Sequence, residues 1–295
     1  MSLTSDGIGT FGSTANFDVQ GNIMSLLYGD NFKGQIDLTG KYGIFKELFY
    51  QNTKVINAEN LSLPATTLAD YCYQGMFGKC TNLTAAPQLL ATTLASGCYQ
   101  SIFQDCSSLV NAPELPATTL AIYCYAYMFN GCTSLTTAPI LPTTVLAEHC
   151  YHGMFSGCTS LTTAPALPAT TLVNSCYSHM FFNCTSLTTA PELPATILTS
   201  YCYYNMFTNC TSLTTAPVLP ATTLVDKCYD GMFKGCINLN YIKAMFTTIP
   251  SISYTNDWVK DVSATGTFVK NSAAEWEVTG VNSVPSGWTI ETASE

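Results

Sequence analysis

Apolar residues recur every 26 positions along most of this chain. Two cysteine positions show the period most clearly, and the same step carries leucines and a phenylalanine. Self-similarity at a fixed period of this length is the signature of stacked structural repeats, so the pattern predicts a solenoid. The first cysteine column is Cys72, Cys98, Cys124, Cys150, Cys176, Cys202 and Cys228, and the second is Cys80, Cys106, Cys132, Cys158, Cys184, Cys210 and Cys236.

Within each unit, the uniform apolar residues are spaced alternately one and three positions apart. In the first unit they are Cys72, Tyr73, Met76, Phe77 and Cys80. This spacing places them on one stripe of a short amphipathic helix over 69–80. The positions between them change from unit to unit, as expected for a side that faces solvent. The pattern therefore predicts one short helix per unit.

A short strand is predicted after each helix. The segment typified by "SLTTA", at 82–86 and its equivalents, is rich in β-forming residues, and Pro87 follows it. Proline donates no ladder hydrogen bond, so the parallel strand should end there. The segment typified by "LPATTL" then turns toward the next helix. Seven coils at a strand spacing of about 4.8 Å make a stack of roughly 35 Å.

Seven units of 26 residues occupy 63–244, and a degenerate copy at 48–61 lacks the cysteines. A repeat stack exposes its core at both ends unless other segments cover it. We therefore expect a solenoid over 48–244, a β-rich N-terminal cap over 1–47 and a C-terminal cap with a β-element over 245–295. Three tryptophans lie in the last segment, and we interpret them as the core of that cap, with a ligand platform as the alternative. They are Trp258, Trp276 and Trp288.

The unit "MFSGCTSLTTAPALP" and its six siblings resemble the BspA-type leucine-rich repeat of bacteria. That repeat has an aromatic residue shortly before a cysteine, followed by "TSL", a short strand and a proline. The resemblance covers 63–244 and implies an α/β solenoid: a curved, right-handed leucine-rich-repeat superhelix with short parallel strands and short helices, capped at both ends. It also implies a cell-surface or secreted protein that acts in adhesion or interaction and is not an enzyme.

Composition and charge exclude some classes of binding partner. Charged residues make up only 10% of the chain, and the net charge of −9 with 10 Lys+Arg would repel a nucleic-acid backbone or an anionic membrane. We expect no membrane span, because no segment has 18 or more consecutive apolar residues. Residues 1–20 show neither the basic nor the apolar part of a signal peptide. An extracellular or cell-surface location is therefore expected from the resemblance alone.

The cysteines are expected to be reduced core residues. A C-x7-C spacing on a helix separates the sulfur atoms by about 12 Å, which is too far for a disulfide within one unit. The spacing also matches no familiar zinc site, and no histidine repeats with it. Buried cysteine behaves as a small apolar residue, so we expect two buried ladders. Disulfides between neighbouring coils, and a metal or redox role, are the alternatives.

The remaining titratable residues indicate no cofactor, no metal and no catalysis. His149, His152 and His179 occupy variable positions, where a fortuitous metal cluster with Glu148 competes with ordinary surface histidines. Carboxylates that share a repeat position lie three coils apart, too far for paired acid–base work. The sequence contains no glycine-rich phosphate loop and no G-x-S-x-G elbow.

The variable side of the predicted helices is the candidate binding surface. Tyrosine, which supplies contact area at low entropic cost, is frequent there. We expect a monomer that binds a host or neighbouring-cell protein or glycan; neutral variation of exposed positions is the rival explanation. Alternatives are a phage or mobile-element adhesin domain and, more remotely, an ice-binding-like threonine lattice. The candidate site residues are Tyr71, Gln74, Tyr123, Tyr127, His149, His152, Tyr201, Tyr204, Asp226 and Asp230.

Overall fold

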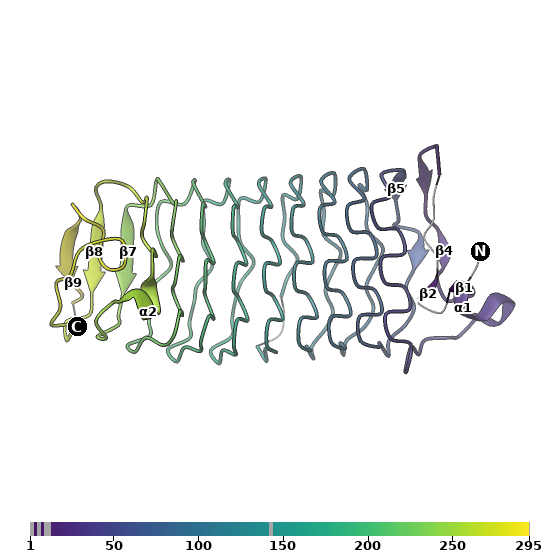
Figure 1. The fold of residues 1–295 in the computed structure, drawn as a ribbon, viewed down its shortest axis with the longest axis horizontal. Helices are drawn as coiled ribbons and strands as arrows, with labels where there is room; N and C mark the ends of the chain where they lie inside the picture. Colours follow the sequence, from purple (N-terminus) through teal and green to yellow (C-terminus); the bar gives the residue numbers. More distant parts are fainter. Residues whose placement is uncertain (1–2, 5–6, 9–12, 142–143, 295) are drawn as a thin grey trace.

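Each repeat unit forms one coil, and the coils lie side by side in an elongated stack with the two chain termini at opposite ends (Figure 1). This computed structural model describes residues 3–4, 7–8, 13–141 and 144–294. Parallel backbone pairing between successive coils confirms the predicted parallel stacking. The local structure within a coil differs from the prediction.

The predicted helix over 69–80 is wrong: this segment is a run of successive β-turns. The amide of Met76 donates to the carbonyl of Tyr73, three residues back, at 3.2 Å. The neighbouring amides point along the stack instead. Those of Tyr73 and Phe77 donate to the carbonyls of Cys98 and Ile102 in the next coil, at 3.0 and 2.9 Å. Half of the amides therefore close turns and half join coils.

The backbone conformation also excludes a helix in this segment. Every fourth residue has a positive φ, as in Tyr71, Gly75 and Lys79 at 57°, 59° and 61°. An α-helix requires negative φ at every residue and repeats every 3.6 residues. The apolar pairs of this sequence recur every 4.0 residues. The turn hydrogen bonds of the observed run recur every two residues, so two turns bring the next apolar pair to the same side. We call the side of the molecule formed by 69–80 and its equivalents the turn face.

The predicted strand at "SLTTA" is present as a single parallel bridge per coil in most units. Asn111 pairs with Thr137, and Thr163 pairs with Thr189. A second column of bridges runs through the "LPATTL" segment, where Thr93 pairs with Thr119. Among the described residues, continuous strands occur only toward the two ends of the stack.

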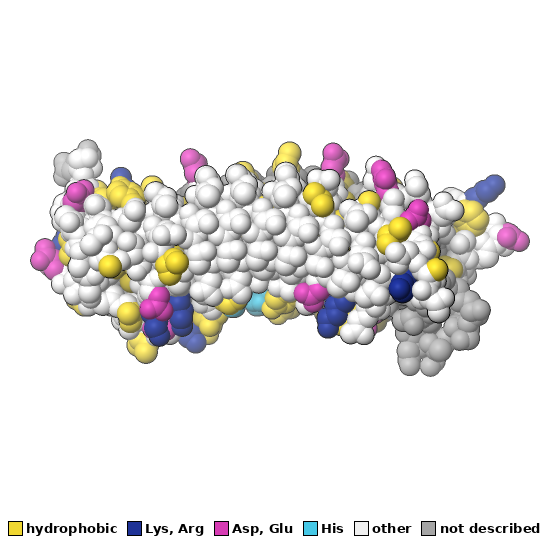
Figure 2. Space-filling model, turned by 90° about the horizontal axis from the view of Figure 1, so that it is seen from above, with side chains coloured by type: hydrophobic (Ala, Val, Ile, Leu, Met, Phe, Trp, Pro, Cys, Tyr) yellow, Lys and Arg dark blue, Asp and Glu magenta, His cyan; other side chains and the backbone are white. Residues whose placement is uncertain are grey.

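The stack is nearly straight in two perpendicular views (Figure 1 and Figure 2), which corrects the expected curvature. A leucine-rich-repeat solenoid curves when helices on one side need more room than strands on the other. Here backbone hydrogen bonds join neighbouring coils on the turn face as well as on the bridge side. Both sides therefore have the same spacing, and no side is wider.

Two aromatic ladders fill the core. The tyrosine and phenylalanine columns that begin at Tyr73 and Phe77 stack from coil to coil with ring centroids 5.6 to 6.0 Å apart. Their planes differ by 15° or less, so the rings adopt the offset stacking that aromatic pairs prefer. Trp258 contacts the last tyrosine and the last phenylalanine and ends both ladders.

All fourteen cysteines are free and buried, which confirms the two reduced ladders. Each thiol of the second column also donates a hydrogen bond to a phenylalanine carbonyl of the preceding coil. The Sγ atom of Cys132, for example, lies 3.1 Å from the carbonyl oxygen of Phe103. That oxygen already accepts the turn hydrogen bond of the Cys106 amide, so the thiol uses its second lone pair.

The N-terminal segment pairs with the first coils. The helical elements there are α1 (Ser25–Tyr28) and the 3₁₀ helix η1 (Gly29–Asn31). Strand β1 (Leu3–Thr4) pairs with β2 (Gly7–Ile8) in antiparallel fashion, whereas β3 (Phe17–Asp18) and β4 (Gly21–Asn22) pair in parallel with β5 (Val55–Asn57) and β6 (Leu61–Ser62).

At the C-terminal end, the parallel pairing continues into a three-stranded sheet in the order β7–β8–β9. All three tryptophans of this segment are buried, with at most 7% of the side chain exposed, as expected for core residues. The elements of this end are β7 (Tyr241–Ala244), α2 (Ile252–Thr255), β8 (Thr267–Lys270) and β9 (Thr289–Thr292).

Candidate functional site

The ten predicted site residues all lie on the turn face, and most of them are half-buried. They alternate with the core residues of the turns, so their side chains are held against neighbouring coils. Asp226 is exposed, whereas Asp230 is only 8% exposed. The positive-φ positions hold Tyr71, Tyr123, Tyr127, His149 and Tyr201, so bulky side chains occupy backbone positions that favour glycine.

The largest side-chain cluster on this face begins with two ring pairs. Tyr123 stacks on His149 of the next coil, with centroids 4.5 Å apart and planes 15° apart. Tyr127 meets His152 edge to face at 4.9 Å, and its hydroxyl lies 2.7 Å from the Nε2 atom of His152. His149 and His152 also contact one another, at 5.7 Å. Four predicted residues from two coils thus form one cluster.

The cluster continues into the next two coils. His152 contacts His179 at 5.3 Å, and His179 contacts Tyr204 at 5.1 Å. Tyr204 in turn contacts Tyr201, and Phe182 packs against His179. The result is an unbroken series of ring contacts along the stack axis. We call it the aromatic ridge; its members are Tyr123, Tyr127, His149, His152, His179, Phe182, Tyr201 and Tyr204.

Glycine in one coil makes room for a ring from the coil before it. A Cβ atom added at Gly153 would lie 2.7 Å from the ring of Tyr127, and one added at Gly97 would lie 2.5 Å from the ring of Tyr71. Both distances are far below ordinary carbon contacts. Each tyrosine ring therefore fits against the next coil only because that coil carries no side chain there.

The histidines of the ridge are held uncharged. Burial, and then the neighbouring His179 and His149, lowers the pKa of His152 to about 4. Burial lowers the pKa of His179 as well. Burial also lowers the pKa of His149, with Glu148 acting in the opposite direction. At neutral pH the ridge is an uncharged surface of rings.

Two ring nitrogens of the ridge have no hydrogen-bond partner among the described residues. They are the Nδ1 atoms of His149 and His152, and both are shielded from solvent. The other histidine is satisfied, because Ser178 and Asn205 approach its two ring nitrogens at 2.9 and 3.3 Å. Neither of the two unpartnered nitrogens is accessible to a bound molecule while the rings keep this packing.

The other predicted residues lie outside the ridge. Tyr71 contacts Tyr42 at 5.3 Å, and Gln74 donates to the side chain of Gln100 at 2.9 Å. They belong to the first coils, and the ring contacts do not connect them to Tyr123. They form a separate N-terminal part of the turn face.

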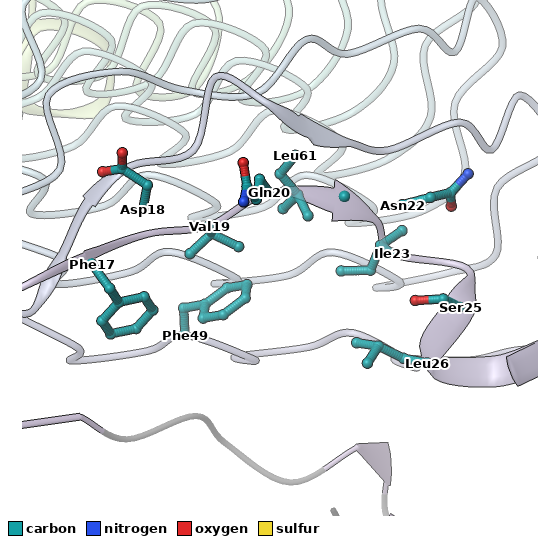
Figure 3. A pocket seen from close by; sticks show the side chains of 11 residues that line it. Phe17, Asp18, Val19, Gln20, Asn22, Ile23, Ser25, Leu26, Phe49 and Leu61 are labelled. Carbon is teal, nitrogen blue, oxygen red and sulfur yellow. The ribbon is translucent and has the colours of Figure 1, made fainter.

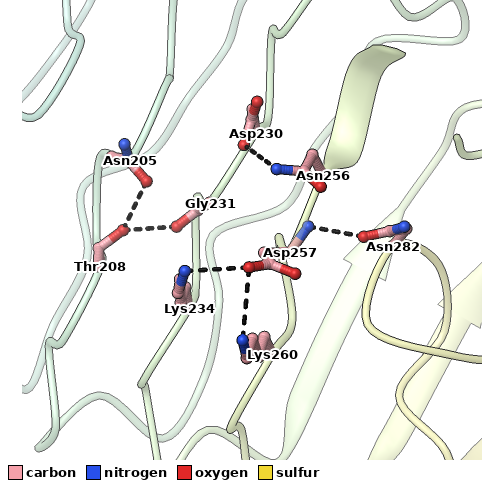
Figure 4. A network of polar contacts seen from close by, with 9 residues as sticks. All are labelled: Asn205, Thr208, Asp230, Gly231, Lys234, Asn256, Asp257, Lys260 and Asn282. Atoms are coloured by element: carbon pink, nitrogen blue, oxygen red, sulfur yellow. Dashed lines mark hydrogen bonds and ion pairs between the residues drawn. The ribbon is translucent and has the colours of Figure 1, made fainter. Parts of the chain in front are cut away.

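Asp226 and Asp230 lie at the C-terminal end of the ridge. Asp230 accepts a hydrogen bond from Asn256 at 3.4 Å, and its burial raises the pKa of its carboxyl group. Next to it, Asp257 is 3.0 Å from Lys234 and 3.7 Å from Lys260 (Figure 4). Asp230 is therefore part of a polar network that joins the last coils.

Sequence reasoning missed three contributors to this surface. His179 and Phe182 belong to the ridge, and Lys227 lies 5.2 Å above the ring of Tyr201. His179 occupies the same repeat position as Tyr127, two units later. This shared repeat position is the feature of the sequence that could have identified His179 as part of the surface.

The described residues around the histidines form no metal-binding group. No group of three or more His, Cys, Asp or Glu side chains in the described part of the chain could hold a metal ion. One cavity, of about 360 Å³, lies near the N-terminus, where Phe17, Phe49 and Leu61 point into it (Figure 3). Among the described residues, no helix combines the length and the apolar character that crossing a bilayer requires.

The threonine columns on the bridge side have structural partners. The hydroxyl of Thr188 donates to the carbonyl of Thr162 at 3.2 Å, and that of Thr84 donates to Ile56 at 2.8 Å. These bonds join neighbouring coils, so the repetition of threonine has a role in the stack itself.

Comparison with known families decides what kind of repeat this is. The sequence model described as "BspA type Leucine rich repeat region" matches residues 44–164 and 150–260, with six copies of the repeat. The chain belongs to the BspA-type leucine-rich repeat family. Leucine-rich repeats generally mediate protein interaction or adhesion, and BspA-type proteins are typically surface or secreted proteins of bacteria. No curated protein matches the chain.

Solved structures similar to this BspA-type chain include two bacterial leucine-rich repeat proteins. One, from Bacteroides ovatus, is 15% identical, with a TM-score of 0.33 over 85% of this chain and 78% of that one. The other, from T. pallidum, is 17% identical, with a TM-score of 0.30 over 74% of this chain and 77% of that one.

Proposed function

We propose that this BspA-type chain is a non-enzymatic interaction protein of the cell surface or the secreted fraction, and that it binds a protein or glycan partner through the aromatic ridge. The observation that carries the proposal is the unbroken series of ring contacts from Tyr123 to Tyr201 on an accessible face. Among the described residues, no other set of surface side chains forms a comparable series.

The ridge has the physical properties of a recognition surface. Its rings are packed against one another before a partner arrives, so little side-chain entropy is lost on binding. Tyrosine hydroxyls supply hydrogen bonds, while the ring faces supply apolar contact area. The ridge carries no charge at neutral pH, which favours a partner that binds through stacking and hydrogen bonds.

The rest of the predicted surface and architecture is part of the same proposal. Tyr71 and Gln74 would extend the surface toward the N-terminus, and Asp226 and Asp230 would border it toward the C-terminus. We also propose right-handed winding, a monomeric state, and caps over 1–47 and 245–295. The pairing of β3 with β5 and the burial of Trp258 support these caps.

A binding screen with matched variants tests the proposal. The purified chain is applied to arrays of glycans and of extracellular-matrix proteins. The test variant combines Tyr127→Ser and His152→Gln, which copy Ser101 and Gln74 from the same repeat positions in other coils. We expect the parent chain to bind at least one array component and the variant to bind it at least tenfold more weakly.

The control is Thr170→Ser on the bridge side, which leaves the ridge intact. Thermal unfolding of all three proteins establishes that the ridge variant is folded. Equal binding by the ridge variant and the control would contradict the proposal and favour neutral variation of this face.

A further inference from the structure

The corner of each coil that carries prolines is a second surface, distinct from the aromatic ridge. We call it the proline corner; it consists of 112–116 and the equivalent segments of the other units. Figure 2 shows acidic and hydrophobic side chains following one another along one long edge of the molecule, whereas the opposite edge carries histidine together with basic, acidic and hydrophobic side chains. The proposed function makes no use of this corner.

Two equivalent cavities lie at the proline corner, three coils apart. One, of about 420 Å³, is lined by 112–116 of one coil and 138–140 of the next. The other, of about 350 Å³, is lined by 190–194 together with Pro217, Val218 and Pro220. Seven of the eight positions in the second lining match the first after a shift of 78 residues, which is three repeat units. The two cavities are therefore built from equivalent segments of the repeat.

Each cavity combines one carboxylate with an apolar wall. Glu114 and Glu192 occupy the same repeat position, between prolines, and both are exposed. At the same repeat position of the next coil, Ile140 and Val218 also line the cavities and are 82% and 49% exposed. A lysine or arginine side chain suits this environment, because its aliphatic stem covers apolar surface while its charged end reaches a carboxylate.

The surrounding charge favours a cationic partner. Between Lys79 and Lys227 the chain contains five acidic residues and no lysine or arginine. Glu114 and Glu192 belong to none of the ion pairs formed by the described residues. Their charges are therefore free to interact with a cation from another molecule.

The spacing of the two carboxylates sets the form of the partner. Three coils at about 4.8 Å separate equivalent positions by about 14 Å. An extended peptide covers about the same length in four residues, at 3.3–3.6 Å each. Between the two glutamates, the same column holds Ile140 and Ala166, which are apolar. A peptide running along the stack would thus meet one acidic side chain, two apolar side chains and a second acidic side chain in turn.

From these features we propose that the proline corner binds an extended peptide segment with two basic side chains four positions apart and apolar side chains between them. The peptide lies along the stack axis, with one basic side chain in each cavity. The proposal names a second partner surface and does not depend on the aromatic ridge.

Fluorescence anisotropy with synthetic peptides tests the proposal. The probe is a short fluorescein-labelled peptide of valine and serine with two lysines four positions apart. We expect saturable binding that weakens with added salt. The pair Glu114→Gln and Glu192→Gln should weaken binding roughly tenfold, about threefold for each charge removed. A second probe, with its lysines two positions apart, should bind the parent chain about threefold more weakly than the first.

The matched control separates specific binding from general attraction to an acidic protein. Asp70 and Glu148 also lie three coils apart, but on the turn face. The pair Asp70→Asn and Glu148→Gln removes the same charge and should leave the affinity within twofold of the parent value. Equal losses in the two double variants, or equal affinity for the two probes, would overturn the proposal. Loss of peptide binding in the Tyr127→Ser and His152→Gln variant would overturn it as well.

Discussion

At the scale of single residues, burial decides the chemistry of the groups that first suggested a reactive site. Two cysteines with a histidine between them, as in Cys150, His152 and Cys158, have the composition of a metal or redox motif. The backbone turns send the two thiols inward and the histidine outward, so the three do not meet. Burial then raises the pKa of the thiols and lowers the pKa of the histidine. Each group is kept in its neutral form.

The first prediction concerns the reactivity of the thiols. Burial raises the pKa of Cys72 and of Cys80 to about 12, so almost no thiolate forms in the folded protein at pH 8. A thiol reagent should detect close to none of the fourteen cysteines in the native protein and all of them after denaturation. A native count near fourteen would refute burial, and a low denatured count would reveal disulfides.

The raised pKa values of the buried thiols also predict that the protein loses stability at alkaline pH. An unfolded thiol ionises near pH 8.5, whereas the buried thiol remains neutral up to about pH 12. The thiol contribution to the free energy of unfolding should therefore be constant below about pH 8.5 and fall above it. Each buried thiol contributes a loss of up to about 1.4 kcal/mol per pH unit. Urea unfolding at a series of pH values from 7 to 11 measures the slope; a flat profile would contradict the prediction.

The lowered pKa of His152 predicts that stability also falls on the acid side, as the pH decreases. Its pKa is about 4 in the folded chain, below the usual value of about 6.5, so the unfolded chain takes up the proton first. Its contribution to stability is present above pH 6.5 and is lost as the pH falls toward 4. The Tm should fall less between pH 6.5 and pH 4 in His152→Gln than in the parent chain. Equal slopes for the two proteins would contradict this assignment.

At the scale of the element, hydrogen bonding between coils replaces the expected helix. In a helix the backbone amides donate hydrogen bonds within the helix itself. In the run of turns, half of the amides donate to the next coil instead. The cost is a left-handed residue at every fourth position. Glycine occupies some of these positions and large side chains occupy others, and several of the glycines accommodate a side chain of the preceding coil.

A comparison of two glycines distinguishes the cost of backbone strain from the cost of steric overlap when a side chain is added. Gly157 and Gly231 both have left-handed φ values, at 75° and 62°. A Cβ atom at Gly157 would make an ordinary contact of 3.5 Å, whereas one at Gly231 would overlap the Oδ1 atom of Asn205. Gly157→Ala should cost about 1 kcal/mol of unfolding free energy from backbone strain alone. Gly231→Ala should cost about 2 kcal/mol more, because of the overlap.

A double variant checks the cause. Adding Asn205→Gly to Gly231→Ala should recover most of the extra loss, whereas Asn205→Gly alone should not stabilise the chain by that amount. Chemical denaturation of the four proteins gives the coupling energy. A coupling near zero would show that the overlap is relieved in another way.

At the scale of the whole molecule, the stack behaves as a one-dimensional array. Each coil contacts mainly its two neighbours, and the aromatic and thiol ladders continue through all seven units. Stability then depends on the number of interfaces between coils and on their register. A change that preserves the register should shorten the molecule without altering its form.

Deletion of one unit tests this property. Removing 72–97 joins Tyr71 to Cys98 and keeps every column in register. The product should remain folded, be shorter by about 4.8 Å in small-angle scattering, and unfold at a lower denaturant concentration. Removing 74–97 instead shifts the columns by two residues and should abolish cooperative unfolding. Two deletions with the same behaviour would contradict the register argument.

The sequence by itself determined the repeat, its length and its inward residues. Columns such as Cys72 and Phe77 recur at fixed steps, and a fixed period with an apolar stripe can be satisfied only by stacking identical coils. The burial and reduced state of the cysteines followed from the same pattern. The side of the chain that carries Tyr127 and His152 was also predictable, because those positions vary between the constant ones.

Only the tertiary structure decided the local backbone and the contacts across the surface. A spacing of one and three fits both a helix and a pair of turns, and hydrogen bonds to the neighbouring coil select the turns. Those contacts join residues 25 or 27 positions apart, as in Tyr127 with His152 and His152 with His179, and no local pattern reveals them. The aromatic ridge and the cavities of the proline corner exist because separate coils lie side by side, and stacking is a property of the folded chain.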